Sequence, residues 1–232
     1  MYSEVLKFGA QIVDALVDYK HPVFVYIPPG GELRGGAWVV IDPSINPEQM
    51  EMYADVESRG GILEPAGIVE VKFRAQQQVQ LMHRLDDTLI QLDKELAAKA
   101  DDEIKAKIAA REEQLLPLYT QIACEFADLH DRTGRMAAKG VIRQPLEWKR
   151  SREFFYWRVR RRVLEQEAVK KVCAADTNLS VKEAKELVSS WLEGDDDKAV
   201  AAFLETSSLD SKIESVRVEA VKRQIAELQG QL

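Results

Sequence analysis

The sequence YIPPGGELRGGAWVVID, residues 26–42, carries the strongest structural signals of the chain. One uninterrupted apolar run, Pro22–Ile27, leads into it, and a second, Trp38–Ile41, comes near its end. Short apolar runs bounded by turn residues are typical of strands that are buried on both faces. We therefore predict two buried strands joined by a glycine-rich loop over residues 28–38.

This predicted loop contains the glycine pairs Gly30-Gly31 and Gly35-Gly36. Glycine lets a backbone approach a ligand closely, and backbone N–H groups aimed at a developing negative charge can form an oxyanion hole. A tight turn without any catalytic role would use the same residues. The loop is not a P-loop, because no Gly-Lys-Ser/Thr follows it, and it lacks the Gly-x-Gly-x-x-Gly fingerprint of dinucleotide-binding folds.

Arg34 stands beside the second glycine pair. Its guanidinium could bind the carboxylate of a ligand. The structural alternative is an ion pair with a nearby acid: Glu32, Asp42 or Glu64.

The chain changes character near Arg74. Residues before it include β-branched runs and most of the glycines, whereas those after it are rich in Ala, Leu, Glu, Lys, Arg and Gln. Before Arg74 we predict an amphipathic helix over 3–19 and weaker strands at 62–63 and 68–73. A helix between buried strands indicates an α/β or α+β layered unit. After Arg74 we predict a mostly helical extension with helices near 75–99, 101–131, 147–174, 180–193, 197–205 and 208–229.

Composition restricts the function classes. The net charge of −7 argues against a nucleic-acid partner, and no apolar run approaches the roughly 20 residues that cross a bilayer. The N-terminus has no secretory pattern. Cys124 and Cys173 are far apart and the three histidines lack metal-ligand spacing, so we predict reduced thiols and no metal site.

The stretch Trp148–Arg162 interleaves basic and aromatic residues. Such interleaving can indicate binding of single-stranded nucleic acid. Helical spacing favours another interpretation, in which the aromatic rings pack in a core and the arginines form a solvated or salt-bridged face. A docking face for an acidic partner or a phosphate-bearing cofactor is the next alternative.

Five segments resemble the carboxyltransferase of eukaryotic-type multidomain acetyl-CoA carboxylases, and the likeness extends from Met1 to about Leu192. The segments are 26–42, 50–65, 68–74, 126–142 and 148–161. The resemblance implies a crotonase/ClpP-like fold of layered ββα units. In that fold, residues 1–74 form the C-terminal part of the core and residues 75–232 a helical extension.

The resemblance also implies a reaction, the transfer of a carboxyl group from N1-carboxybiotin to acetyl-CoA to give malonyl-CoA, for fatty acid biosynthesis. Backbone N–H groups would stabilise negative charge on oxygen. By motif position the catalytic residues are Gly35 and Gly36, through their backbone N–H groups, and Arg34, which would support the loop. The implied biotin-side residues are Gly9, Val39, Ile62 and Glu64.

The same resemblance implies that the chain is a fragment, because Met1 falls where this family has an internal methionine. We expect it to be inactive alone and to need the N-terminal half of the carboxyltransferase, a biotin carrier domain and a homodimer partner. Biotin sits on the carrier, acetyl-CoA is the substrate, and no nucleic acid or membrane partner is expected. We predict a cytoplasmic location, with the plastid as the alternative. The alternative function is a non-catalytic helical dimerisation or scaffold module derived from this fold.

Overall fold

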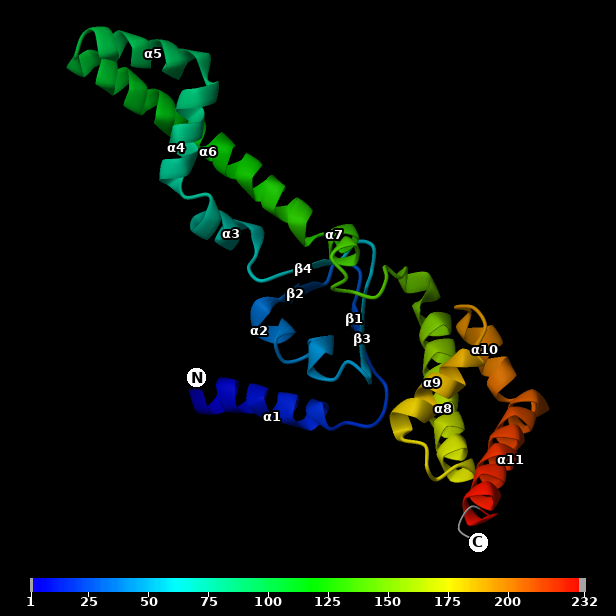
Figure 1. Ribbon diagram of the computed structural model, residues 1–232. Helices are drawn as coiled ribbons and strands as arrows, with labels where there is room; N and C mark the ends of the chain where they lie inside the picture. The colour runs from blue at the N-terminus through cyan, green and yellow to red at the C-terminus, as the bar shows by residue number, and fades with distance from the viewer. Residues whose placement is uncertain (1, 230–232) are drawn as a thin grey trace. The chain divides into compact units, whose positions relative to one another are not determined.

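The structure, a computed structural model, describes residues 2–229, with side chains from Glu4 to Gln229 (Figure 1). Met1, where the fragment was predicted to begin, lies outside the described residues. The chain forms two compact units. The first comprises Met1–Tyr19 with Phe24–Leu146, and the second Lys20–Val23 with Glu147–Leu232.

Two small sheets give the first unit its β structure. Strand β1 (Val23–Ile27) pairs with β3 (Met50–Ala54), and β2 (Glu32–Arg34) runs parallel to β4 (Arg59–Gly61). Strand β3 is buried along its whole length. The chain is therefore a mixed helical and sheet fold, which agrees with the α/β class predicted from the sequence.

The predicted strand at Trp38–Ile41 is wrong. The short helix α2 (Gly35–Trp38) and the turn after it occupy these residues, and β2 lies inside the predicted loop. Local hydrogen bonds satisfy the polar groups of this run: the indole N–H of Trp38 donates to Asp42 at 2.8 Å, and the amide of Ile41 to the Trp38 carbonyl at 3.0 Å. Because these groups are already paired, the run needs no neighbouring strand.

The predicted strands at 62–63 and 68–73 are also wrong, because helix α3 (Pro65–Lys72) follows a bend there. Proline fits the first turn of a helix, where its missing N–H costs nothing. Strand β3 was not predicted, since Glu51 interrupts its apolar pattern. That carboxylate is nevertheless buried and accepts a hydrogen bond from the Tyr53 hydroxyl.

The other helices of the first unit follow the predicted ranges, with one new break and one additional short helix. Residues 75–99 divide at Asp86, whose carboxylate accepts a hydrogen bond from the Leu89 amide at 3.0 Å and so caps a new helix. Residues 133–135, predicted as a break, begin a short helix, and Gly140, with a φ of 68°, ends it. The helices, after a π-helical turn Tyr2–Leu6, are α1 (Lys7–Val17), α4 (Ala75–Leu85), α5 (Asp87–Ala98), α6 (Asp102–Asp131) and α7 (Thr133–Ala138), with a 3-10 turn at Pro43–Ile45.

Helices α4, α5 and α6 pack together around Met82, Leu89 and Ile108 (Figure 1). His83 of α4 joins all three helices. Its Nδ1 lies 2.6 Å from the Asp93 carboxylate on α5, and its Nε2 lies 2.7 Å from the Glu112 carboxylate on α6. The hydrogen bond to Asp93, then that to Glu112, raise the pKa of His83 above its ordinary 6.5 against the opposing effect of burial.

We expect His83 to stabilise this bundle only at lower pH. A pKa raised by folding contributes stability that is complete below the unfolded value and is lost as pH rises through the folded value. The difference in unfolding free energy between the wild type and His83→Gln should therefore shrink as pH rises from about 6 to above the raised pKa. Urea denaturation at a series of pH values measures it, and a difference that does not vary with pH would refute the role of the charged histidine.

Up to Gln229, the second unit consists of the helices α8 (Trp148–Ala175), α9 (Val181–Ser190), α10 (Asp197–Leu204) and α11 (Ser207–Gln229). They surround an apolar core that includes Val172, Val188 and Leu204. The predicted capping box is confirmed, because the Ser180 hydroxyl accepts from the Glu183 amide at 3.3 Å and the Glu183 carboxylate accepts from the Ser180 amide at 2.8 Å. None of the helices within residues 2–229 is long and apolar enough to span a membrane.

The arginines of α8 are salt-bridged, as the sequence favoured, but the predicted packing of the aromatic rings in a core is wrong for Trp148 and Tyr156, which are exposed. Arg158 and Arg161 both bind the Asp197 carboxylate, at 2.9 and 3.0 Å, and Arg160 binds Glu205 at 2.5 Å. Arg158 is itself buried. These arginines hold α8 against α10 through ion pairs with acidic side chains. The structure therefore gives no support to the interpretation of the basic face of α8 as a nucleic-acid binding site.

Candidate functional site

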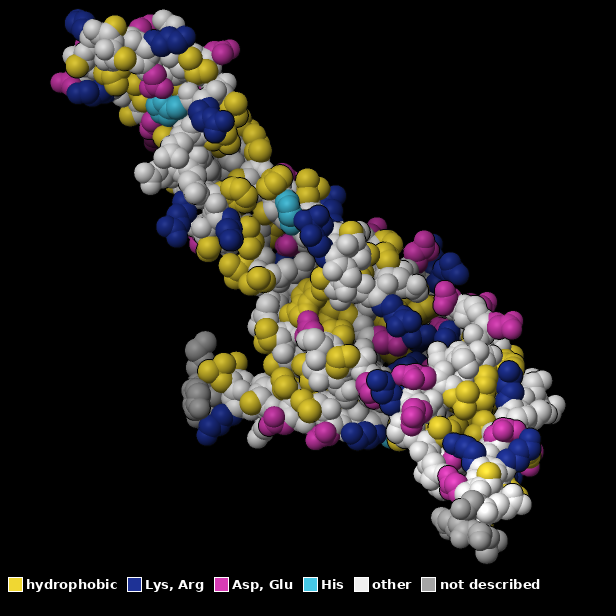
Figure 2. Space-filling model, in the orientation of Figure 1, with side chains coloured by type: hydrophobic (Ala, Val, Ile, Leu, Met, Phe, Trp, Pro, Cys, Tyr) yellow, Lys and Arg dark blue, Asp and Glu magenta, His cyan; other side chains and the backbone are white. Residues whose placement is uncertain are grey.

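An apolar cavity of about 380 Å³ opens beside α2 in the first unit. Three residues predicted for the site line it: Gly35, Val39 and Ile62. Figure 2 shows hydrophobic side chains gathered around a hollow among α2, β4 and α7. The remaining lining residues are Trp38, Gly60, Gly61, His130, Arg135, Met136, Lys139 and Val141. The surface of the site is therefore almost entirely apolar, and Arg135 and Lys139 contribute to it from α7 and its C-terminal end.

The two glycines at the start of α2 have different surroundings. Gly35 donates its amide to the Ile62 carbonyl at 3.0 Å, and a Cβ on Gly35 would lie 2.9 Å from that same oxygen. A Cβ on Gly36 would meet nothing within 4 Å. The Gly36 amide lies in the first turn of a helix, where N–H groups have no partner within the helix. Gly36 does not line the cavity, but of the predicted pair it is the residue with open space around its α-carbon.

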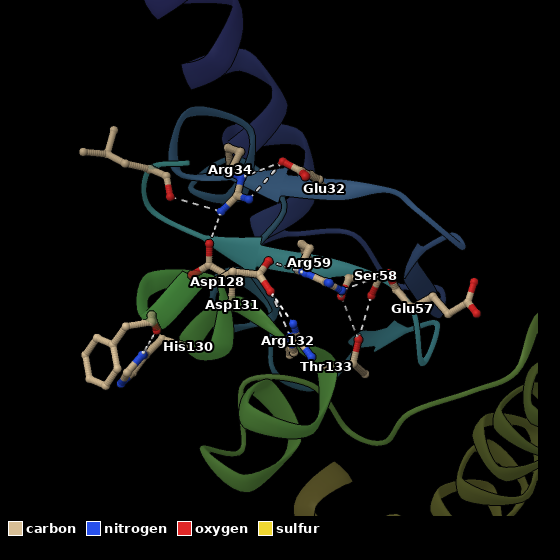
Figure 3. A network of polar contacts seen from close by, with 12 residues as sticks. Glu32, Arg34, Glu57, Ser58, Arg59, Asp128, His130, Asp131, Arg132 and Thr133 are labelled. Atoms are coloured by element: carbon tan, nitrogen blue, oxygen red, sulfur yellow. Dashed lines mark hydrogen bonds and ion pairs between the residues drawn. The ribbon is translucent and has the colours of Figure 1, made fainter. Parts of the chain in front are cut away.

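Arg34 forms ion pairs within the protein (Figure 3). One of its terminal nitrogens lies 2.5 Å from the Asp131 carboxylate and 3.1 Å from the Leu63 carbonyl, and its other nitrogens bind Glu32. Glu32 was among the acids anticipated from the sequence, whereas Asp131 was not. Burial alone would lower the pKa of Arg34, but the hydrogen bonds to Asp131 and Glu32 raise it, so the guanidinium stays charged.

A second ion pair joins β4 to the same end of α6 (Figure 3). Arg59 binds the Asp128 carboxylate at 2.7 Å, and Arg132 binds it at 2.8 Å. The bond to Arg59 is the main cause that holds the pKa of Asp128 below its ordinary value. The C-terminal end of α6 thus supplies one carboxylate to each strand of the small parallel sheet.

The glycines of β4 permit close packing that the sequence analysis did not assign. A Cβ on Gly60 would lie 2.5 Å from the Met136 sulfur and 2.7 Å from the Trp38 ring. A Cβ on Gly61 would lie 2.5 Å from an oxygen of Asp131. In the sequence, Gly60-Gly61 repeats the Gly-Gly pattern that had drawn attention to Gly35-Gly36. That repeat was the signal from which the close packing of β4 could have been predicted.

Besides Arg34 and Gly36, two further predicted residues, Gly9 and Glu64, do not line the cavity. Gly9 of α1 packs near Val40, because a Cβ there would lie 3.3 Å from a methyl group of that residue. Glu64 is exposed and precedes α3, where its carbonyl accepts from the Ile68 amide at 2.9 Å. Both residues support elements that form the site.

The arrangement offers a polar donor at the edge of an apolar space. Across residues 4–229, no group of three or more His, Cys, Asp or Glu side chains could hold a metal ion. Trp38, Val39 and Ile62 contribute apolar surface, and the Gly36 amide lies next to the lining residue Gly35, in the first turn of α2. Such a site suits a ligand with a polar oxygen on a largely apolar frame.

The chain belongs to the carboxyl transferase domain family, whose model matches residues 1–163. Its similar relatives are acetyl-CoA carboxylases. A mitochondrial acetyl-CoA carboxylase of Saccharomyces cerevisiae is 49% identical over 250 residues, which cover 100% of this chain and 11% of the relative. Acetyl-CoA carboxylase of Schizosaccharomyces pombe is 50% identical over 223 residues, 90% of this chain and 10% of the relative. The chain therefore spans about one tenth of the length of these relatives.

Proposed function

We propose that this chain is the C-terminal half of the carboxyltransferase of a eukaryotic-type acetyl-CoA carboxylase. The observation that carries the proposal is 49% identity to such an enzyme across the whole chain. The overall reaction moves a carboxyl group from N1-carboxybiotin to acetyl-CoA and yields malonyl-CoA. Carboxybiotin, when bound, would supply the carboxyl group that is transferred, and biotin would be released.

The cavity beside α2 is the proposed biotin-side half of the active site. Gly36 follows the lining residue Gly35, and the space around its α-carbon is open, so a ureido oxygen bound in the cavity would approach its amide from the cavity's edge. Negative charge on that oxygen would be stabilised by a preorganised N–H donor. Gly35 keeps the turn in place through its bond to Ile62, and Arg34 holds the neighbouring Leu63 carbonyl.

The walls of the cavity would position the ring. Val39 and Ile62 are 65% and 78% exposed, which is high for apolar side chains and leaves them available to a ligand or a second protein surface. Gly9 would let α1 approach this wall through Val40, and Glu64 would fix the start of α3. No catalytic histidine or cysteine is required of this half.

The remaining features of the proposal concern the parent protein. We propose a crotonase-like core over residues 1–74 with a helical extension over 75–232. Partners would be the N-terminal half of the carboxyltransferase, the biotin carrier domain and a second subunit. Exposed apolar side chains along α6 favour such partners: Leu118, Ile122, Phe126 and Leu129. For the compartment we propose the cytoplasm over the plastid, while one relative is mitochondrial by name.

Filling the cavity tests the proposal against the scaffold alternative. In the full-length protein, Val39→Trp should slow malonyl-CoA formation at least about tenfold, because a bulky ring would displace the substrate from its reacting position. ATP-dependent carboxylation of the carrier biotin should not change. The matched control is Val71→Trp, since Val71 is the same residue type and is also exposed but lies on α3 outside the cavity. Equal transfer rates in both variants and the wild type would favour the scaffold module.

A further inference from the structure

Asp131 is a buried carboxylate at the last residue of α6. It is only 7% exposed, and its oxygen lies 2.5 Å from a guanidinium nitrogen of Arg34. Figure 3 shows this side chain directed from α6 toward the small parallel sheet. A buried charge must be paired, because an isolated one is costly, so the pair fixes both side chains.

The nitrogen that binds Asp131 also donates to the Leu63 carbonyl, at 3.1 Å. The residue before Leu63 is Ile62, whose carbonyl accepts the Gly35 amide at 3.0 Å. Two consecutive carbonyls are therefore held by two consecutive residues, Arg34 and Gly35. Together these bonds set the spacing between the first turn of α2 and the segment at 62–63, and Gly35 and Ile62 of these two segments both line the cavity.

The carboxylate has little freedom to move. A Cβ on Gly61 would lie 2.5 Å from one oxygen of Asp131 and 3.2 Å from the Arg34 nitrogen. The backbone of β4 therefore packs directly against the ion pair. A shift of Asp131 would be passed to Arg34, and from Arg34 to the Leu63 carbonyl.

We propose that Asp131 is a positioning residue for carboxyl transfer, which acts through Arg34 to aim the Gly36 amide. The inference rests on the proposed function. A charge-assisted hydrogen bond is about twice as strong as a neutral one. The charge of Asp131 therefore strengthens its bond to Arg34 and restricts the movement of the guanidinium. Misplacement of a catalytic group by about 1 Å can cost about 10²-fold in rate, and a smaller loosening costs less.

The test compares Asp131→Asn with Asp128→Asn in the full-length protein. Both residues lie at the end of α6 and pair with an arginine of the small sheet. Arg59, the partner of Asp128, donates to the carbonyls of Glu57 and Ser58 and not to the segment at 62–63. We expect Asp131→Asn to lower kcat of carboxyl transfer about tenfold. KM for acetyl-CoA and ATP-dependent biotin carboxylation should change less than about twofold, and Asp128→Asn should transfer at nearly the normal rate.

Arg34→Lys gives an independent measurement if Asp131→Asn fails to fold. Lysine keeps the charge but lacks the planar fork that binds several acceptors at once, so this variant should also lower kcat. Where both single variants fold, the double variant should be no slower than the worse one, because both act through one link.

Three results would overturn the inference. They are equal kcat losses in Asp131→Asn and Asp128→Asn, a folded Arg34→Lys with normal kcat, and multiplicative losses in the double variant. A wild-type protein that carboxylates its biotin but forms no malonyl-CoA would instead remove the proposed function itself. The two failures are therefore distinguishable.

Discussion

Gly36→Val in the full-length protein should slow carboxyl transfer by about 10²–10³-fold, the loss typical of removing one oxyanion donor. The branched side chain would occupy the open space beside the amide and keep a ligand oxygen away from it. The chain itself can accept the new side chain, because a Cβ on Gly36 meets nothing within 4 Å. The melting temperature should therefore stay close to that of the wild type, while carrier biotin is still carboxylated.

Gly134→Val is the matched control for this prediction. Gly134 lies in the short helix α7, and a Cβ there also meets nothing within 4 Å. Gly134 does not line the cavity and lies on a different helix from Gly36, so transfer should remain nearly normal. A folded Gly36→Val protein that transfers as fast as this control would show that the glycine pair only forms a turn.

Gly60→Ala should destabilise the first unit by about 3 kcal/mol, near the upper end of the usual cost of overpacking. The added Cβ would lie 2.5 Å from the Met136 sulfur and 2.7 Å from the Trp38 ring. The ring cannot move aside cheaply, since its N–H is hydrogen-bonded to Asp42 at 2.8 Å. Urea denaturation of the chain measures the change in unfolding free energy.

Gly67→Ala is the control for this effect. The nearest atom to a Cβ on Gly67 is 3.5 Å away, and the residue lies within α3. Alanine is favoured over glycine in a helix by about 0.5–1 kcal/mol, so this variant should be as stable as the wild type or more so. Equal stability of the Gly60 and Gly67 variants would contradict the close packing of β4 against α2 and α7.

Local signals predicted most of the helices. The helices of the second unit follow the sequence ranges closely, and the capping box at Ser180 begins α9 as expected. The strands were harder to predict. Trp38–Ile41 has the composition of a buried strand, but the bond from Trp38 to Asp42 stabilises a turn instead. Strand β3 has a buried glutamate at Glu51, so an apolar pattern could not reveal it.

The candidate site was predicted in part. The glycine pair and the family resemblance brought attention to Gly35, Val39 and Ile62, which do line one cavity. The partner of Arg34 was missed because Asp131 is 97 residues away in the chain. Periodicity and capping patterns report neighbours within a few residues. A contact between a loop and the end of a distant helix leaves no such trace.

A structure of the complete protein with biocytin bound would test the proposed role of Gly36 most directly. We predict that the ureido oxygen lies in the cavity beside α2, about 2.7–3.1 Å from the Gly36 amide nitrogen. Val39 and Ile62 should then contact the bound ring. Biocytin bound away from this cavity, with the Gly36 amide donating to another group of the protein, would contradict the proposal.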